Sequence, residues 1–304
     1  MQAPLTGHEP VMLAEVIRLL DPRGGQCVVD CTLGRGGHAL ATAQRLGADG
    51  LLIGLDADPR NLEFAAAQLK KSACPTRLFH ANFAELPEVL RQVGRNTVDG
   101  ILADLGVSTN QLLGSEYGMS FDRDMPLDMR IDPRIEESAV ELVNSLPEEQ
   151  LARVLYELAQ ERYARRIARK IGEARRVSPI KNTEALAELV RSAVPRRGGA
   201  PPRIDPATRT FLALRMAVNG EMPNLAALLQ HGPAMLAPAG RMAVISFQST
   251  EDRAVKQAFG MLERSGVVTL LTKKPLFPTP QEIARNPRSR SAKLRAIQKG
   301  VASC

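Results

Sequence analysis

The chain of 304 residues has 44% hydrophobic and 4% aromatic residues, 40 Lys or Arg against 33 Asp or Glu, and four Cys. This apolar content suffices for a packed core and excludes a disordered chain, and so few Cys exclude a disulfide scaffold. Because no apolar run reaches the roughly 18 residues of a membrane span, and Met1 to Glu9 lacks a basic and then apolar leader, we expect a cytoplasmic protein without membrane contact.

The net charge of +7 is unevenly distributed along the sequence. Residues 150–200 hold 12 Lys or Arg and five acids, and residues 285–304 hold six Lys or Arg and no acid. The rest of the chain carries 22 basic and 28 acidic residues and is therefore acidic. Two basic segments on an acidic protein are typical of a face that binds a polyanion, although two solvated helix surfaces would give the same count.

The first part of the chain alternates short apolar strands with helices. Strands are expected at 27–31, 51–56, 77–80 and 99–104, and helices at 39–46 and 60–71. This alternation is typical of βαβ units, which build a parallel sheet with helices on both faces.

The alternation stops for about a hundred residues after the fourth strand. A loop rich in Gly, Ser, Met and Asp covers 106–131, and helices are expected at 148–160, 162–176 and 183–193, before a breaker-rich linker at 195–202. A structureless loop of this length is implausible within one compact sheet. We therefore predict that residues 111–205 form an inserted helical domain, which would recognise the substrate.

The α/β pattern then resumes. Helices are expected at 207–219, 224–236 and 251–264, and strands at 241–247, 267–272 and 292–297. The sequence thus predicts an α/β, Rossmann-like sheet of about seven strands. Its two parts, 1–110 and 206–304, would form one domain around the helical insertion, with a basic C-terminal tail.

A glycine-rich loop, Thr-Leu-Gly-Arg-Gly-Gly-His at 32–38, follows the first strand and opens a helix. Its glycines let the backbone approach a ligand, and the N–H groups at the start of the helix can receive an anionic group. Asp56 ends the second strand, 20 residues after Gly36. A carboxylate at this place accepts hydrogen bonds from ribose hydroxyls, so the loop and the acid together predict a nucleoside cofactor.

The loop differs from the G-x-G-x-x-G pattern of dinucleotide sites, because its glycines are Gly34, Gly36 and Gly37 and an acid, Asp30, precedes them. A carboxylate at that position would repel a pyrophosphate, but it suits the ammonium of S-adenosylmethionine. Phe83, just after the third strand, is placed to flank the adenine ring, although an aromatic residue is more often part of a core. A nicotinamide-dependent Rossmann oxidoreductase and a non-catalytic RNA-binding assembly factor for the ribosome remain the alternatives.

Several blocks of sequence match one known family in order and over nearly the whole chain. They lie at 8–12, 30–38, 56–59, 99–108 with Gln111, 121–132, 206–211, 246–253 and 286–295. The most distinctive are Pro-Leu-Asp-Met-Arg at 126–130 and Asn-Pro-Arg-Ser-Arg-Ser-Ala-Lys-Leu-Arg at 286–295. With these blocks the chain resembles the MraW/RsmH family, S-adenosylmethionine-dependent methyltransferases that methylate N4 of a cytidine in the decoding region of bacterial 16S rRNA.

The resemblance implies which residues contact the cofactor: Gly36, Gly37, His38, Asp56, Phe83, Asp104 and Gln111. The glycines, Asp56 and Phe83 also follow from the loop and strand pattern, whereas the others come chiefly from the resemblance. Asp104, at the carboxyl end of a strand, is in addition the candidate catalytic residue, for positioning the amine or the cofactor. The implied partner is 16S rRNA, within the small ribosomal subunit. The sequence does not decide between a monomer and a homodimer.

The basic segments supply the candidate RNA-binding residues. They are Arg162, Arg165, Arg166, Arg169 and Lys170 in the insertion, and Arg288, Arg290, Lys293 and Arg295 near the C-terminus. No metal site is expected, because Cys27 and Cys31 lie in or beside a buried strand and no second pair stands at ligand spacing.

The chain departs from the family pattern at a few positions. Gln248 stands where family members usually have a histidine, so we doubt that a proton-handling histidine is essential there. Asn110 replaces a usual proline and Cys31 a usual small residue, and neither change should abolish cofactor binding.

Overall fold

The computed structural model describes residues 10–195 and 204–301, and these form two compact units. Unit 1 comprises the described residues up to Gly106 and from Met222 onward, and unit 2 runs from Val107 to Glu221. Two segments interpreted from the sequence lie outside the described residues. They are residues 1–9, where no leader is expected, and all but the first residue of the linker at 195–202. None of the described helices is long and apolar enough to cross a membrane.

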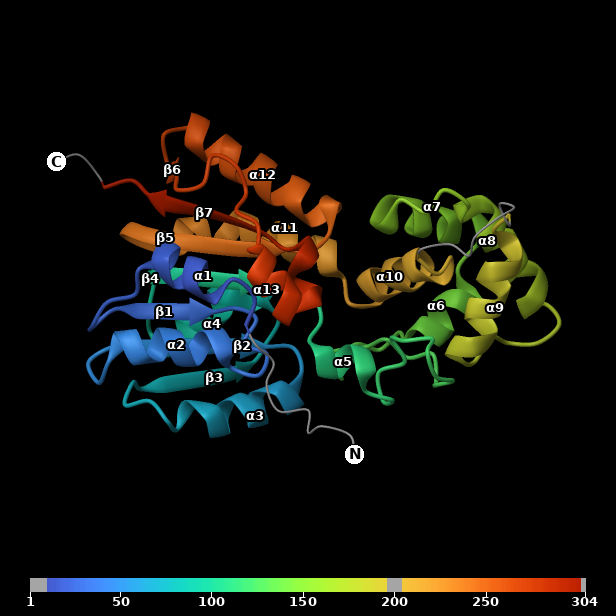
Figure 1. Cartoon of the computed structure of the whole chain (residues 1–304), viewed down its shortest axis with the longest axis horizontal. Coiled ribbons are helices and arrows are strands. Elements are labelled where there is room, and N and C mark those ends of the chain that lie inside the picture. Colours follow the sequence, from blue (N-terminus) through green and yellow to red (C-terminus); the bar gives the residue numbers. More distant parts are fainter. Residues whose placement is uncertain (1–9, 196–203, 302–304) are drawn as a thin grey trace. The chain divides into compact units, whose positions relative to one another are not determined.

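Unit 1 is built on one seven-stranded sheet with the strand order β3-β2-β1-β4-β5-β7-β6 (Figure 1). Neighbouring strands from β3 to β5 are parallel, whereas β7 is antiparallel to both of its neighbours. The strands are β1 (Cys27–Asp30), β2 (Leu51–Asp56), β3 (Thr76–His80), β4 (Val98–Asp104), β5 (Leu236–Ser246), β6 (Val268–Leu270) and β7 (Lys293–Lys299). This confirms the predicted Rossmann-like α/β fold.

Helices cover both faces of this sheet because strand side chains alternate between the faces. Val28 and Leu52 pack with residues of α2 and α3, whereas Val29 and Ile53, one position further along, pack with residues of α4, α11 and α12. Further along the sheet, Ile245 packs with α1. The helices are α1 (Leu13–Leu20), α2 (Gly37–Leu46), α3 (Pro59–Leu69), α4 (Leu86–Val93), α11 (Glu221–His231), α12 (Ser249–Arg264) and α13 (Pro280–Arg285).

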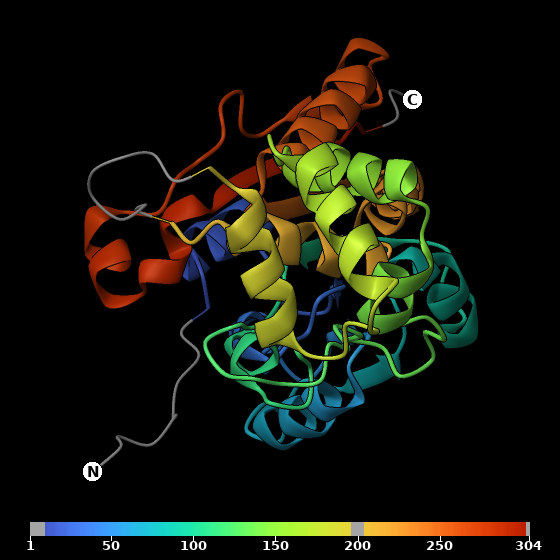
Figure 2. The ribbon, with the colours of Figure 1, turned by 90° about the vertical axis from the view of Figure 1, so that its right-hand side faces the viewer.

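Unit 2 is helical and has its own apolar core; Figure 2 shows it from a second direction. Its helices are α5 (Thr109–Leu113), α6 (Ala139–Ser145), α7 (Glu148–Ala159), α8 (Ala164–Arg175), α9 (Thr183–Ala193) and α10 (Ala207–Val218). The sequence-based boundaries assigned α10 to the α/β part, and the structure corrects this. Phe211 and Leu214 of α10 are buried in the core of unit 2, and α10 packs on α7.

The Pro-Leu-Asp-Met-Arg block at 126–130 has a structural role within unit 2. Leu127 and Met129 are fully buried, and the N–H of Met129 donates to the carbonyl of Tyr117 at 2.7 Å. Arg130 donates through Nη2 to Asp128 at 2.8 Å. Gly118 has a φ of 60°, and a Cβ at this residue would overlap the carbonyl oxygen of Pro126. The block therefore fixes the long loop between α5 and α6 against the helices.

Candidate cofactor site

The glycine-rich loop joins β1 to α2 at the carboxyl edge of the sheet. Gly34 and Gly36 have φ values of 51° and 80°, in the region that favours glycine. A Cβ on Gly36 would lie 3.3 Å from the Cβ of Ala65 in α3, and one on Gly37 would lie 3.2 Å from the ring of Pro10. The loop is thus glycine-rich because its backbone passes close to α3 and to the segment before α1.

Asp56, at the end of β2, holds this loop in place. Its Oδ2 accepts from the N–H of Gly34 at 2.7 Å, and its Oδ1 accepts from the N–H of Asp58 at 2.8 Å. The amide of Asn61 adds longer contacts of 3.3 and 3.4 Å. Burial raises the pKa of Asp56 to about 6. The strand-end acid and the glycine loop predicted from sequence are therefore in direct contact, and the contacts of Asn61 are the longest of those made to Asp56.

Asp30 and Asp104 end β1 and β4, which are neighbours in the sheet, and β1 lies between β4 and β2. Thr32 connects them: its N–H donates to Asp30 Oδ1 at 3.1 Å, and its Oγ1 accepts from the N–H of Asp104 at 2.6 Å. Asp104 Oδ1 is buried and has no hydrogen-bond partner within the described part of the chain. A carboxylate oxygen in this state is available to a ligand.

The acids at this edge act on one another electrostatically. Burial raises the pKa of Asp30 to about 7, with a smaller contribution from the charge of Asp56. The hydrogen bond from Thr32 acts in the opposite direction and lowers this pKa. Burial, followed by the charges of Asp30 and Glu251, raises the pKa of Asp104 well above its usual value. A group of buried acids of this kind attracts a cation and repels a pyrophosphate. The site therefore fits a cofactor with ammonium and sulfonium groups better than a nicotinamide dinucleotide.

His38, in the first turn of α2, lies beside Asp104. Its Nε2 is 2.9 Å from the carbonyl oxygen of Val11, and its Nδ1 is 3.7 Å from Asp104 Oδ2. The imidazole is buried, with 6% of the residue exposed. The structure thus brings together five of the expected cofactor residues in unit 1: Gly36, Gly37, His38, Asp56 and Asp104.

The other two expected cofactor residues have different surroundings. Phe83 begins a short 3-10 helix after β3, where it is half-buried and packs against the core of unit 1. Its ring thus takes part in the core, the alternative considered from the sequence. Gln111 belongs to unit 2, where its buried side chain accepts from the N–H of Ser108 at 2.9 Å and caps α5.

Two residues of this edge, Thr32 and Glu251, were not predicted from the sequence. Thr32 stands inside the predicted loop, but no pattern indicated its contacts to the ends of β1 and β4. Glu251 was assigned only to the first turn of its helix; it is buried and accepts from the N–H groups of Phe247 and Gln248, each at 2.9 Å. Glu251 therefore fixes the start of α12, the place where Gln248 replaces the usual histidine of the family.

The candidate RNA-binding residues divide into exposed and buried ones. Arg162, Arg165, Arg166 and Arg169 are exposed beside or on α8, and Arg288 and Arg290 are exposed in a 3-10 helix at Pro287–Ser291. Lys170 is half-buried, 3.4 Å from Glu173.

Lys293 and Arg295 lie in β7, which corresponds to the strand predicted at 292–297 and pairs with β5 and β6. Their surroundings differ from those of the exposed arginines. Arg295 is only 8% exposed and donates to Asp252 at 2.7 Å, and Lys293 donates to the same carboxylate at 3.3 Å. Since these cations are already paired and Arg295 is covered, they stabilise the contact of β7 with α12.

Cys27, Cys31 and Cys74 are buried free thiols, and burial raises the pKa of each. Within residues 10–195 and 204–301, no group of three or more His, Cys, Asp or Glu could hold a metal ion.

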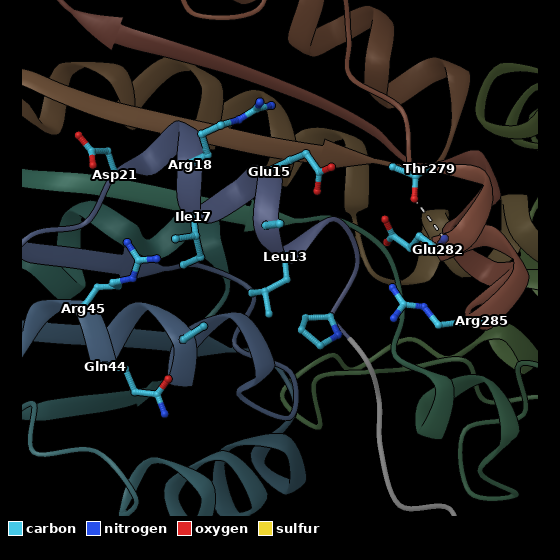
Figure 3. Close-up of a pocket in the computed structure, with 13 residues that line it drawn as sticks. Leu13, Glu15, Ile17, Arg18, Asp21, Gln44, Arg45, Thr279, Glu282 and Arg285 are labelled. Carbon is cyan, nitrogen blue, oxygen red and sulfur yellow. Dashed lines mark hydrogen bonds between the residues drawn. The ribbon is translucent and has the colours of Figure 1, made fainter.

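A separate pocket of about 850 Å³ lies among α1, α2 and α13 (Figure 3). Its charged lining consists of Glu15, Arg18, Asp21, Arg45, Glu282 and Arg285, and none of the expected site residues lines it. The equal numbers of acids and arginines give no preference for an anion or a cation.

A family model described as the MraW methylase family matches residues 5–300 of the chain. Two relatives are both named ribosomal RNA small subunit methyltransferase H. The protein from Syntrophotalea carbinolica is 48% identical, over 96% of this chain and 98% of that protein. The protein from Solibacter usitatus is 46% identical, over 96% of this chain and 99% of that protein. Among solved structures, TrmN from Thermus thermophilus has a TM-score of 0.45 and 14% identity, over 95% of this chain and 48% of that chain.

The family match covers the glycine loop, the strand-end acids and the helical unit alike. It confirms the resemblance predicted from the sequence, and with it a methyltransferase that takes its methyl group from S-adenosylmethionine. This chain belongs to the MraW methylase family.

Proposed function

We propose that this protein transfers a methyl group from S-adenosylmethionine to N4 of a cytidine in the decoding region of 16S rRNA, in the small ribosomal subunit. The observation that carries the proposal is the group of buried acids around the glycine loop, among them Asp104, whose Oδ1 has no hydrogen-bond partner in the described part of the chain. The names of the relatives supply small-subunit rRNA as the substrate, and the resemblance of the sequence supplies the cytosine amine.

The cofactor, when bound, supplies an electrophilic methyl group on a positively charged sulfur. Asp56, Gly36, Gly37 and Phe83 would hold its adenosine portion, and Asp30 its ammonium, directly or through water. Gln111 is proposed as a further contact on the resemblance alone. The contribution of the chain is to hold the acceptor nitrogen, the methyl carbon and the sulfur in line, away from water.

The exocyclic amine of cytosine is a poor nucleophile because its lone pair is delocalised into the ring. An acceptor for one of its N–H groups favours a more tetrahedral nitrogen and takes up the charge that develops there. Asp104 Oδ1 is our candidate for this acceptor, because it is buried and has no other partner in the described residues. The carbonyls of the following turn, at Leu105 and Gly106, would assist it.

The RNA has to present a single base, which requires that the base leave its stack. The exposed arginines at the start of α8, and Arg288 and Arg290 in unit 1, would bind phosphates around it. The low aromatic content of 4% disfavours base stacking as the main source of affinity.

Methyl transfer from labelled S-adenosylmethionine to small ribosomal subunits and to naked 16S rRNA tests the proposal, with the modified nucleotide mapped afterwards. We expect one N4-methylated cytidine in the decoding region. Calorimetric titrations with S-adenosylmethionine and with NAD should show binding of the first alone. Tight NAD binding, or the absence of any methylated cytidine with both substrates, would disprove the proposed function.

The affinity for S-adenosylmethionine is expected to rise with pH between about 5.5 and 7.5, by up to about tenfold per pH unit for each proton released. Burial raises the pKa of Asp30 to about 7 and that of Asp56 to about 6, so both are partly protonated in the free protein at the lower pH. A cationic ligand favours their carboxylates and therefore releases protons on binding. Calorimetry in buffers of different ionisation enthalpy measures this release, and Asp30→Asn should reduce it. A constant affinity over this range would contradict the acid-lined site.

A further inference from the structure

We propose that His38 is a positioning residue for Asp104: the two side chains share one proton, and the pair accepts the proton that the methylated amine releases. This inference rests on the proposed transfer to an amine nitrogen. It assigns His38 a role in proton transfer, beyond the cofactor contact that the resemblance implies.

The hydrogen bonds fix the orientation of the His38 ring. A carbonyl oxygen can only accept, so Nε2, at 2.9 Å from the oxygen of Val11, carries a hydrogen. Val11 is itself held, because the N–H of Met12 donates to the buried Glu282 at 2.7 Å and Pro10 packs on Gly37. In the neutral ring, Nδ1 is then the nitrogen with the lone pair, and it faces Asp104 Oδ2.

The distance of 3.7 Å between Nδ1 and Oδ2 is within ion-pair range and slightly longer than a hydrogen bond. Sharing of a proton requires a closer approach of Nδ1 and Oδ2 in the reacting protein. The second oxygen of Asp104, Oδ1, is the buried atom without a partner in the described residues. The carboxyl group therefore has one oxygen toward His38 and one left for a ligand.

Charges around the pair disfavour a full charge on either member alone. Burial disfavours a negative charge on Asp104, and so do Asp30 at the end of β1 and Glu251 in α12. All three raise the pKa of its carboxyl group. His38 is the second residue of α2, where the positive end of the helix disfavours an imidazolium. A single proton shared between Nδ1 and Oδ2 satisfies both members, as in other coupled pairs of titrating groups.

In the reaction, the bond between N4 and the methyl carbon forms as the bond between that carbon and sulfur breaks, and the positive charge passes from sulfur to the amine. The amine then gives one proton to Asp104 Oδ1, while the shared proton moves fully to His38 Nδ1. The pair now carries one positive charge, close to the acids Asp30 and Glu251. It returns its extra proton to water after the product leaves, so that no other reactant is needed.

Two variants of His38 separate its contact to Asp104 from its contact to Val11. His38→Gln places an amide N–H near the position of Nε2 and keeps the bond to Val11, but it offers no base to Asp104. His38→Asn places an amide near the position of Nδ1, where it can donate to Asp104, and loses the bond to Val11. Thermal unfolding of both variants checks that they are folded.

We expect His38→Gln to lower kcat by about 10- to 100-fold, to shift the acidic limb of the pH profile of kcat, and to change the Kd for S-adenosylmethionine by less than about threefold. His38→Asn should recover part of the lost kcat. The inference is overturned if His38→Gln has the wild-type kcat and pH profile, or if its whole defect lies in the Kd for the cofactor.

A measurement without turnover completes the test. In protein with ¹³C-labelled histidine, the midpoint of the NMR titration of His38 should shift by about half a pH unit or more in the Asp104→Asn variant, because the two groups titrate together. Unchanged titration of His38, with normal methyl transfer by the wild type, would refute the pair and leave the proposed function intact. Failure of the proposed function would instead be seen as absent methyl transfer by the wild type, whatever the titration shows.

Discussion

Asp104→Ala is expected to lower the rate of methyl transfer by about 100-fold or more, the usual size of the effect of removing a group that handles a proton. The variant would lose the proposed acceptor for the amine and one of the buried acids at this edge of the sheet. A weaker binding of S-adenosylmethionine, by about tenfold, should accompany the loss of rate if the carboxylate also attracts the cationic cofactor. Single-turnover kinetics and calorimetry measure the two effects separately.

The same substitution should leave the free protein at least as stable as the wild type. Asp104 Oδ1 is buried without a hydrogen-bond partner among the residues that the structure describes, and the backbone N–H of residue 104 keeps its bond to Thr32 in the variant. Removing a buried carboxyl group that has one unsatisfied oxygen relieves a desolvation cost, and such costs are typical of functional sites. A large fall in Tm would show that Asp104 serves the fold.

Asp49→Ala is a matched control, since Asp49 is an exposed acid just before β2, at the opposite end of that strand from Asp56. It should change neither rate nor affinity. The catalytic assignment is wrong if Asp104→Ala leaves both the turnover and the affinity for S-adenosylmethionine unchanged.

The sheet could be predicted closely because its strands are short apolar runs bounded by turn residues. The predicted strands at 51–56 and 99–104 correspond to β2 and β4 with at most one residue of difference. By contrast, α1 and α4 were missed, although Leu86, Val89 and Leu90 of α4 have helical spacing and are buried in the core of unit 1. The helical pattern of α4 is thus present in the sequence.

The contacts of the site could be predicted only in part. The glycine loop and Asp56 meet because the carboxyl ends of neighbouring parallel strands meet at one edge of the sheet. The approach of His38 to Asp104 depends on the hydrogen bond between the His38 ring and the carbonyl of Val11, in the segment before α1. No spacing along the chain encodes this contact. Likewise, the pairing of Arg295 with Asp252 depends on the place of β7 between β5 and β6, which charge counts do not show.

Replacement of Arg162, Arg165 and Arg166 by glutamate is expected to weaken RNA binding by about 100-fold at moderate salt and to flatten its salt dependence. These residues are exposed, and within the described residues none of them forms an ion pair, whereas Arg169 and Lys170 lie 3.9 and 3.4 Å from Glu173. The free cations are therefore the best candidates for phosphates. The slope of log K against log salt should fall by about 2, since each lost phosphate contact removes roughly 0.7 to 0.9.

The matched control reverses the same number of charges in unit 1, with Lys70, Lys71 and Arg95 changed to glutamate; all three are exposed and lie outside the candidate sites. Any effect of net charge alone would appear equally in both variants. We expect the control to keep most of the slope, and both variants to bind S-adenosylmethionine like the wild type. An unchanged slope after the changes at α8, or an equal loss in the control, would show that this helix is a solvated surface and that the RNA is bound elsewhere.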